Sequence, residues 1–540
     1  MRGTMMDFPL TLRMIFERGV RLYPEQQVVT GRAGGTHRYG YADMAARVHR
    51  LASALQREGI GPGDRVASFG WNSYRHLELY FAVPLIGAVL HCANIRLFPD
   101  QLAYILDHAA DRWVFADRSL LAALRALDLP KVERIVSMDD GSGAETGDAL
   151  DYEALLERGQ ARAELAEVGE NDAAMMCYTS GTTGNPKGVA YSHRALVLHS
   201  FGECMVDTLA VSQRDVVMPI VPMFHANAWG LPYASTFVGA KQVFPGVAPK
   251  PDALVQLMVD EGVTLCAGVP TIFLGLQDLI AKRRDELKLK EIVIGGSAVP
   301  ASLIRAYDQA GIRIVQARGM TEMTPLGTVN RLKPRLDGLD DDARVAVRAK
   351  QGLPSPGVEA RAIDGDGRDV PRDGQTMGEL IVRGPWVTGT YYQDPRAADS
   401  FTEDGWFRTG DIVTIDVEGY IEICDRSKDV IKSGGEWISS VALENALMGH
   451  PGVQEAAVIA APDERWGERP LACVVVRPEQ KAQLGADELR SHLASRVARW
   501  WLPDRYEFID EIPKTSVGKF DKKVLRARLL EGKVVGAPSE

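Results

Sequence analysis

Helix-like and strand-like segments alternate through the first two-thirds of this 540-residue chain, and this alternation constrains the fold more than any other feature. Residues 41–55 place apolar side chains at helical spacing, and Gly59 ends the run. Short apolar runs with the length of buried strands lie at 65–69, 216–221, 292–294 and 312–315. Such alternation predicts an α/β fold with open sheets.

Two of these strands lead directly into glycine-containing motifs. Strand 292–294 runs into Gly295, and strand 312–315 runs toward residues 319–322. Open α/β sheets bind ligands in the crevice at the carboxyl ends of their strands. We therefore expect both motifs to lie at a ligand site.

The chain is too long for a single core, so two or more domains are expected. A boundary is predicted near residues 425–429. The segment after it has the pattern of a small α+β unit. Its expected elements are a helix from Ser439 or Ser440 to Met448, strands at 456–459 and 472–476, and a helix from Asp487.

Charge and cysteine content exclude several classes of protein. A net charge of −10 does not provide the excess of positive charge that binding to nucleic acid or to an anionic membrane usually needs. The six cysteines are scattered without metal-ligand or redox spacing, which is typical of buried thiols in a reducing compartment. Because no apolar stretch approaches a membrane span and no signal peptide is visible, we expect a cytoplasmic protein.

Residues 178–188, Tyr-Thr-Ser-Gly-Thr-Thr-Gly-Asn-Pro-Lys-Gly, combine hydroxyls, glycines and one cation without any acidic side chain. Glycines let successive backbone N–H groups approach anionic oxygens, and the hydroxyls and Lys187 add donors and charge. A plain surface turn is the commoner fate of such a composition. The density of donors favours a loop that binds a polyphosphate.

This loop matches neither of the two common nucleotide-binding motifs. Lys187 follows a proline and precedes a glycine, so the Walker register fails. No Gly-x-Gly-x-x-Gly sequence lies between a strand and a helix. Another way of binding ATP must be considered.

The loop resembles the signature of the acyl-adenylate-forming superfamily, which includes the acyl-CoA ligases. Six further motifs match in the superfamily's order, almost to the end of the chain. They are Pro222-Met223-Phe224-His225, Gly295-Gly296-Ser297, Gly319-Met320-Thr321-Glu322, Trp406-Phe407-Arg408-Thr409-Gly410-Asp411, Asp425-Arg426-Ser427-Lys428-Asp429, and Pro513-Lys514-Thr515-Ser516-Val517-Gly518-Lys519. The resemblance implies a large N-terminal α/β domain of several subdomains over 1–425, a hinge at 426–428, and a small mobile α+β domain over 429–540.

The resemblance also implies roles for individual residues. ATP or AMP would be bound by Thr179, Ser180, Gly181, Thr182, Thr183, Gly184, Lys187, Gly295, Gly296, Ser297, Gly319, Met320, Thr321, Asp411, Arg426 and Lys519. Lys519, Thr179 and Glu322 would be catalytic, and Thr179 and Glu322 would hold Mg²⁺. His225 and Trp229 would line the acyl pocket, and Lys428, Lys432, Gly435, Glu436 and Trp437 would form the hinge and the CoA tunnel.

Each of these roles has a plainer alternative. Glu322 could be a carboxylate that favours a helix start. Lys428 could be a solvated side chain, and Lys519 could belong to a basic tail. His225 could be a satisfied core residue, and Gly435 could be part of a simple turn.

The resemblance implies an ATP-dependent ligase that converts a carboxylate to an acyl-AMP and then to a CoA thioester. Segments such as 193–200 and 432–440 resemble bacterial medium- and long-chain fatty acyl-CoA synthetases, a branch that includes methylmercaptopropionate-CoA ligases. Three alternatives remain: a CoA ligase for methylmercaptopropionate or another short or aryl acid, transfer of the adenylate to another acceptor, and a catalytically silent nucleotide-binding homologue. ATP, CoA and a fatty acid are the expected partners, and a homodimer is implied only by the resemblance.

One position departs from the superfamily pattern. The residue before Gly319, which is usually an aromatic side chain that stacks on adenine, is Arg318. A guanidinium plane can also stack on a π face. ATP binding therefore need not be lost at this position, and the effect of Arg318 on adenine affinity stays open.

Overall fold

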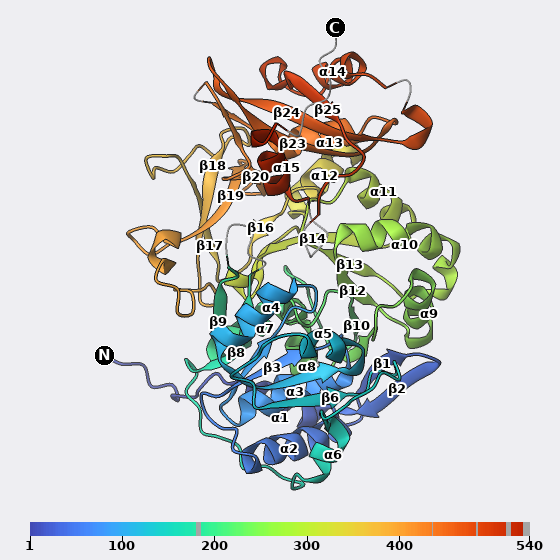
Figure 1. Ribbon diagram of the computed structural model, residues 1–540, viewed down its shortest axis with the longest axis vertical. Helices are drawn as coiled ribbons and strands as arrows, with labels where there is room; N and C mark the ends of the chain where they lie inside the picture. Colours follow the sequence, from blue (N-terminus) through green and yellow to red (C-terminus); the bar gives the residue numbers. More distant parts are fainter. Residues whose placement is uncertain (180–184, 435, 482–483, 515–519, 533–540) are drawn as a thin grey trace. The chain divides into compact units, whose positions relative to one another are not determined.

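The structure is a computed structural model that describes residues 1–179, 185–434, 436–481, 484–514 and 520–532. The chain forms two compact units (Figure 1). Unit 1 comprises residues 1–359 and 383–407, and unit 2 comprises residues 360–382 and 408–540. The predicted α/β class, with a large N-terminal part and a smaller C-terminal part, is confirmed. The division of the chain at 426–428 stays a prediction.

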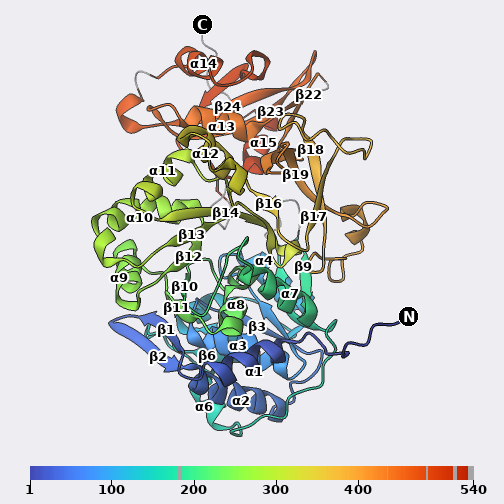
Figure 2. The ribbon, with the colours of Figure 1, turned by 180° about the vertical axis from the view of Figure 1, so that it is seen from behind.

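A nine-stranded sheet in unit 1 carries two of the predicted motifs. Its order is β16 (Leu353–Pro354), β15 (Leu326–Val329), β14 (Arg313–Gly319), β13 (Glu291–Ile294), β12 (Leu265–Gly268), β10 (Val216–Pro219), β11 (Lys241–Phe244), β1 (Gln27–Arg32) and β2 (Gly35–Gly40). The six strands from β14 to β1 are parallel. Helices α9 (Pro251–Glu261), α10 (Pro270–Lys282) and α11 (Ala301–Gln309) lie beside this sheet (Figure 2). Their buried side chains belong to its core.

A seven-stranded sheet in unit 1 carries residues 179–187, the predicted phosphate-binding loop, which we call the phosphate loop. Its order is β7 (Leu150–Asp151), β6 (Arg134–Met138), β5 (Asp111–Asp117), β3 (Arg65–Phe69), β4 (Val89–Cys92), β8 (Ala173–Tyr178) and β9 (Gly188–Ser192). All neighbours are parallel except β8 and β9. Residues 179–187 therefore connect two antiparallel strands at the carboxyl end of β8.

The other α-helices of unit 1 lie before or between these strands along the chain. They are α1 (Leu12–Leu22), α2 (Tyr41–Arg57), α3 (Tyr74–Leu85), α4 (Pro99–Ala109), α5 (Leu121–Arg125), α6 (Tyr152–Glu157), α7 (His193–Cys204), α8 (Leu231–Val238) and α12 (Asp341–Arg348). Helix α7 begins directly after β9, where the Ser192 side chain accepts a hydrogen bond from the Ala195 N–H and caps the helix. The phosphate loop, β9 and α7 thus form one continuous segment.

Two smaller sheets make up most of unit 2. One has the order β17 (Glu359–Ile363), β18 (Gly378–Arg383), β19 (Phe407–Ile415) and β20 (Ile421–Arg426). The other has the order β22 (Glu436–Ile438), β21 (Ile431–Ser433), β24 (Gly467–Val476) and β23 (Val453–Asp463), with β25 (Arg505–Phe508) beside β24. Helices α13 (Ser440–Met448), α14 (Ala486–Ala494) and α15 (Lys522–Leu530) accompany the second sheet.

Most predicted elements are confirmed within a few residues. Strand β14 is longer than the predicted strand and runs through Gly319, because Arg318 and Gly319 still pair with β15. Strand β10 ends at Pro219, two residues before the predicted end. No helix in the described ranges has both the length and the apolar character needed to cross a membrane.

Candidate functional site

Hydrogen bonds join the two ends of the phosphate loop, Thr179 and Lys187, in unit 1. The Thr179 N–H donates to the Lys187 carbonyl at 2.9 Å, and the Lys187 N–H donates to Thr179 Oγ1 at 3.1 Å. These bonds extend the pairing of β8 with β9 by one step into the loop. The predicted nucleotide-binding residues Ser180, Gly181, Thr182, Thr183 and Gly184 lie outside the described residues.

Tyr391 contacts both Lys187 and Glu322, two residues that the sequence assigned to the nucleotide site. Lys187 Nζ lies 4.4 Å from the centre of the Tyr391 ring, and the Tyr391 hydroxyl donates to Glu322 Oε1 at 2.7 Å. Burial, followed by the nearby Glu322 carboxylate, raises the pKa of Tyr391 far above its usual range. Its hydroxyl therefore stays protonated and serves as the donor. Sequence reasoning missed Tyr391, because this residue lies outside all of the motifs that were recognised.

The predicted metal carboxylate lies in a short buried turn after β14. Glu322 is 6% exposed in a three-residue 3-10 helix, Thr321–Met323. The Thr321 carbonyl accepts a hydrogen bond from the Tyr191 hydroxyl at 2.8 Å, and the Met320 N–H donates to the Pro325 carbonyl at 3.1 Å. A Cβ on Gly319 would lie 2.1 Å from the Pro325 carbonyl oxygen, so only glycine fits there.

The donors around Glu322 fit a magnesium–nucleotide complex better than a metal bound by protein alone. No group of three or more His, Cys, Asp or Glu side chains that could hold a metal occurs among the described residues. Mg²⁺ commonly binds through one or two carboxylates together with substrate phosphates and water. Glu322 supplies one such carboxylate, and its use of Mg²⁺ together with Thr179 stays a prediction.

Arg318 is buried at the position where the sequence predicted a group that stacks on adenine. It is 5% exposed, and its Nη1 lies 3.1 Å from the Met323 sulfur. Its Nη2 lies 3.5 Å from the Met320 sulfur. The side chain therefore packs along its own loop, and its stacking on adenine stays a prediction.

The predicted acyl residue Trp229 lies beside the glycine motif after β13. A Cβ on Gly295 would lie 3.2 Å from the Trp229 ring, so the glycine lets the indole approach the strand end. Gly296 has a φ of +87°, and both Gly296 and Ser297 are exposed. His225 is exposed at the start of the turn Ala226–Gly230.

Unit 2 brings together the two predicted ribose-binding residues. Asp411 on β19 is the cross-strand partner of Arg426 on β20, and Arg426 Nη1 lies 2.9 Å from Asp411 Oδ1. Asp411 is 2% exposed, whereas Arg426 is exposed. A buried carboxylate held by a cation at the surface can accept hydrogen bonds from two neighbouring hydroxyls.

The described residues among those predicted for the hinge and the CoA tunnel lie between the end of β20 and the end of β22 in unit 2. Lys428 is in the turn between β20 and β21, and Lys432 is the cross-strand partner of Trp437 in the hairpin of β21 and β22. Glu436 is exposed at the start of β22. Gly435 and Lys519 lie outside the described residues.

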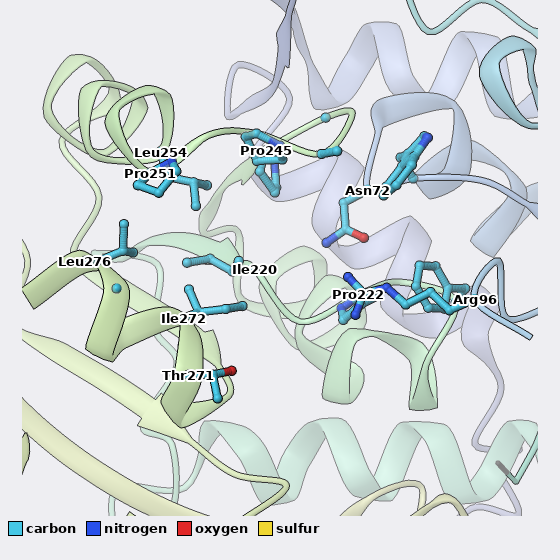
Figure 3. A pocket seen from close by; sticks show the side chains of 16 residues that line it. Asn72, Arg96, Ile220, Pro222, Pro245, Pro251, Leu254, Thr271, Ile272 and Leu276 are labelled. Carbon is cyan, nitrogen blue, oxygen red and sulfur yellow. The ribbon is translucent and has the colours of Figure 1, made fainter. Parts of the chain in front are cut away.

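A cavity of about 380 Å³ in unit 1 was not predicted from the sequence. Figure 3 shows Ile220, Ile272 and Leu276 on one side of it and Asn72 and Arg96 on the other. Asn72 is fully engaged, because its Nδ2 donates to the Pro219 and Val221 carbonyls and its Oδ1 accepts from the Met223 N–H. No described residue forms a hydrogen bond or an ion pair with the Arg96 guanidinium. The cavity thus combines apolar walls with one available cation.

The α/β fold and the matches to two family models define an adenylate-forming enzyme. Residues 16–392 match the AMP-binding enzyme family, and residues 442–519 match the AMP-binding enzyme C-terminal domain. The chain belongs to the AMP-binding enzyme family.

Relatives cover nearly the whole chain. It is 50% identical to a long-chain-fatty-acid–CoA ligase of Thermus thermophilus, with 97% of this chain and 96% of that protein covered. It is 44% identical to a 3-methylmercaptopropionyl-CoA ligase of Ruegeria pomeroyi, with 97% of this chain and 98% of that protein covered. Among solved structures, the anthranilate CoA ligase AuaEII in complex with anthranoyl-AMP matches with a TM-score of 0.83 and 25% identity, covering 98% of this chain and 99% of that one.

Proposed function

We propose that this protein is an ATP-dependent fatty acid–CoA ligase acting on medium- or long-chain acids. The observation that carries the proposal is the 50% identity with a long-chain-fatty-acid–CoA ligase over nearly the full length of both chains. The fastened ends of the phosphate loop and the Lys187–Tyr391–Glu322 arrangement support the adenylation step.

In the first step, a carboxylate oxygen of the acid attacks the α-phosphorus of ATP, and diphosphate leaves. Catalysis of this step consists mainly of positioning and charge neutralisation. Residues 179–187 would bind the leaving diphosphate through backbone N–H groups, hydroxyls and the Lys187 ammonium. Asp411 and Arg426 would bind the ribose, and Lys519 would neutralise charge between the carboxylate and the α-phosphate.

Glu322 and Thr179 would hold Mg²⁺ together with phosphate oxygens. The metal, when bound, offsets the negative charge of the phosphates. Tyr391 fixes one carboxylate oxygen of Glu322 by its hydrogen bond.

In the second step, the thiol of CoA attacks the acyl carbonyl carbon and AMP leaves. We propose that the cavity beside Arg96 receives part of CoA, with the apolar walls around the pantetheine arm and the guanidinium on a phosphate. The Arg96 guanidinium favours this assignment, because it can pair with a phosphate of CoA. Lys428, Lys432, Gly435, Glu436 and Trp437 remain the proposed hinge and CoA residues of unit 2.

Mg²⁺ dependence, a homodimer and a cytoplasmic location also belong to the proposal. Light scattering of the purified protein tests the dimer, and a chelator titration tests the metal requirement.

The substrate class is tested by incubating the enzyme with ATP, CoA and straight-chain acids of graded length while AMP, diphosphate and acyl-CoA are measured. We expect all three products in equal amounts with medium or long chains. Activity confined to short acids such as methylmercaptopropionate would favour the alternative suggested by the relative from Ruegeria pomeroyi.

A further inference from the structure

A buried pair of titratable side chains on α7 has no part in the steps described above. His199 and Glu203 lie one turn apart and are 1% and 0% exposed. His199 Nδ1 and Glu203 Oε2 are 4.0 Å apart, which is too long for a hydrogen bond. Neither carboxyl oxygen of Glu203 has a hydrogen-bond partner among the described residues. Such a pair is costly to bury and calls for an explanation.

The contacts of His199 define its protonation. Its Nε2 accepts a hydrogen bond from the Leu326 N–H at 3.1 Å, so the ring proton is on Nδ1 and faces Glu203. Burial lowers the pKa of His199 to about 3 and raises the pKa of Glu203 well above its ordinary value. Both side chains are therefore uncharged.

On one side, the pair packs against the turn that carries the predicted acyl residue. A Cβ on Gly230 would lie 2.5 Å from His199 Cε1 and 3.0 Å from Glu203 Oε2. Gly230 has a φ of +82° and follows four non-glycine residues, 226–229, with positive φ. Such backbone costs about 1–3 kcal/mol per residue and persists only where its surroundings hold it. We call residues 226–230 the acyl turn.

On the other side, His199 binds the strand that follows Glu322. Its partner Leu326 begins β15, directly after residues 321–325. Trp386 packs edge-on against the His199 ring at 6.0 Å, and its Nε1 donates to the Leu326 carbonyl at 2.8 Å. One imidazole thus contacts both the acyl turn and the backbone next to the metal carboxylate.

We propose that His199, backed by Glu203, is a positioning residue that fixes the acyl turn relative to the Glu322 loop. Its ring sets the separation between the group that would guide the acid and the group that would hold the metal–nucleotide complex. This inference rests on the proposed ligase function and adds to it a coupling between acid binding and metal binding.

The test compares three histidine variants. His199→Leu removes the acceptor for the Leu326 N–H, whereas His199→Gln keeps a carbonyl oxygen that can replace Nε2. His193→Leu is the matched control, because His193 lies on the same helix, is also 1% exposed and accepts the Leu12 N–H at 3.2 Å. The control loses the same kind of bond, but its partner is the first residue of α1.

The acid KM and the half-saturating Mg²⁺ concentration are measured by acid-dependent diphosphate release. We expect His199→Leu to raise both constants about tenfold, since small misplacements of reacting groups are costly. His199→Gln should restore both to within about twofold, and His193→Leu should change neither. Equal constants in His199→Leu and His193→Leu, or no rescue by His199→Gln, would overturn the inference.

Glu203 supplies a second comparison if His199→Leu does not fold. Glu203→Gln keeps an uncharged side chain of the same shape and should leave both constants unchanged, whereas Glu203→Ala should raise both. Identical constants in the two variants would overturn the inference. A wild-type protein that releases no diphosphate with any acid would overturn the ligase function, and this inference with it.

Discussion

Replacement of Lys522 by methionine should destabilise unit 2 strongly, and more so at alkaline pH. Lys522 begins α15, and its Nζ lies 2.6 Å from both Glu444 Oε1 and Ser440 Oγ. Both charged side chains are less than 10% exposed. The Ser440 hydroxyl also donates to the buried Asp425 carboxylate at 2.6 Å. Lys522→Met therefore leaves two buried carboxyl groups without their shared cation.

The expected loss in the free energy of unfolding follows from the burial of Lys522 and Glu444. Loss of one partner from a buried ion pair costs about 3–5 kcal/mol, a large fraction of the stability of a domain. Burial raises the pKa of Glu444 to about 7 even though Lys522 lowers it. A carboxyl group whose folded pKa is raised loses stability as pH rises from its unfolded value through its folded value. The cost of Lys522→Met should thus be small near about pH 5, where Glu444 is protonated, and larger near about pH 8, where Glu444 of the parent protein is ionised.

The assay is hydrogen exchange of the β23 and β24 amides in urea, because a protein with two units need not unfold in one step. Lys514→Met is the matched control, since Lys514 pairs with Glu455 at 2.6 Å on the surface of the same unit. It should cost less than about 1 kcal/mol at either pH. Lys522→Met with Glu444→Gln should recover most of the loss. A cost for Lys522→Met that matches the control, or that is equal at both pH values, would refute the reasoning.

Three further predictions concern catalysis. Arg96→Ala should raise the KM for CoA about tenfold and leave the KM for ATP unchanged, because a charge-assisted contact to phosphate is lost; equal changes in both constants would contradict the assignment of the cavity. Lys519→Ala should abolish acyl-AMP formation but spare thioester formation from supplied acyl-AMP, as single-turnover measurements can show; equal loss of both steps would argue against its assigned role. Arg318→Tyr should lower the KM for ATP by adding an aromatic ring for adenine, and an unchanged or raised KM would remove the stacking argument.

Local patterns in the sequence predicted the secondary structure well. The strand at 65–69 coincides with β3, and the helix expected to end at Met448 is α13 with Ser439 as its cap. Periodicity and capping are properties of neighbouring residues, so a single sequence contains them.

Contacts between distant segments were not predictable in the same way. Tyr391 meets Lys187 and Glu322 across long stretches of chain, and no spacing in the sequence marks it as their neighbour. The left-handed run at 226–229 was missed because alanine and tryptophan rarely adopt positive φ. The sequence motifs predicted the nucleotide residues only through their resemblance to a family.

Exchange of labelled diphosphate into ATP tests the central claim most directly, because it requires a reversible acyl-adenylate and no CoA. We expect exchange that depends on a medium- or long-chain fatty acid and on Mg²⁺. Absence of exchange with every acid in the series, or exchange at the same rate without any acid, would contradict the account.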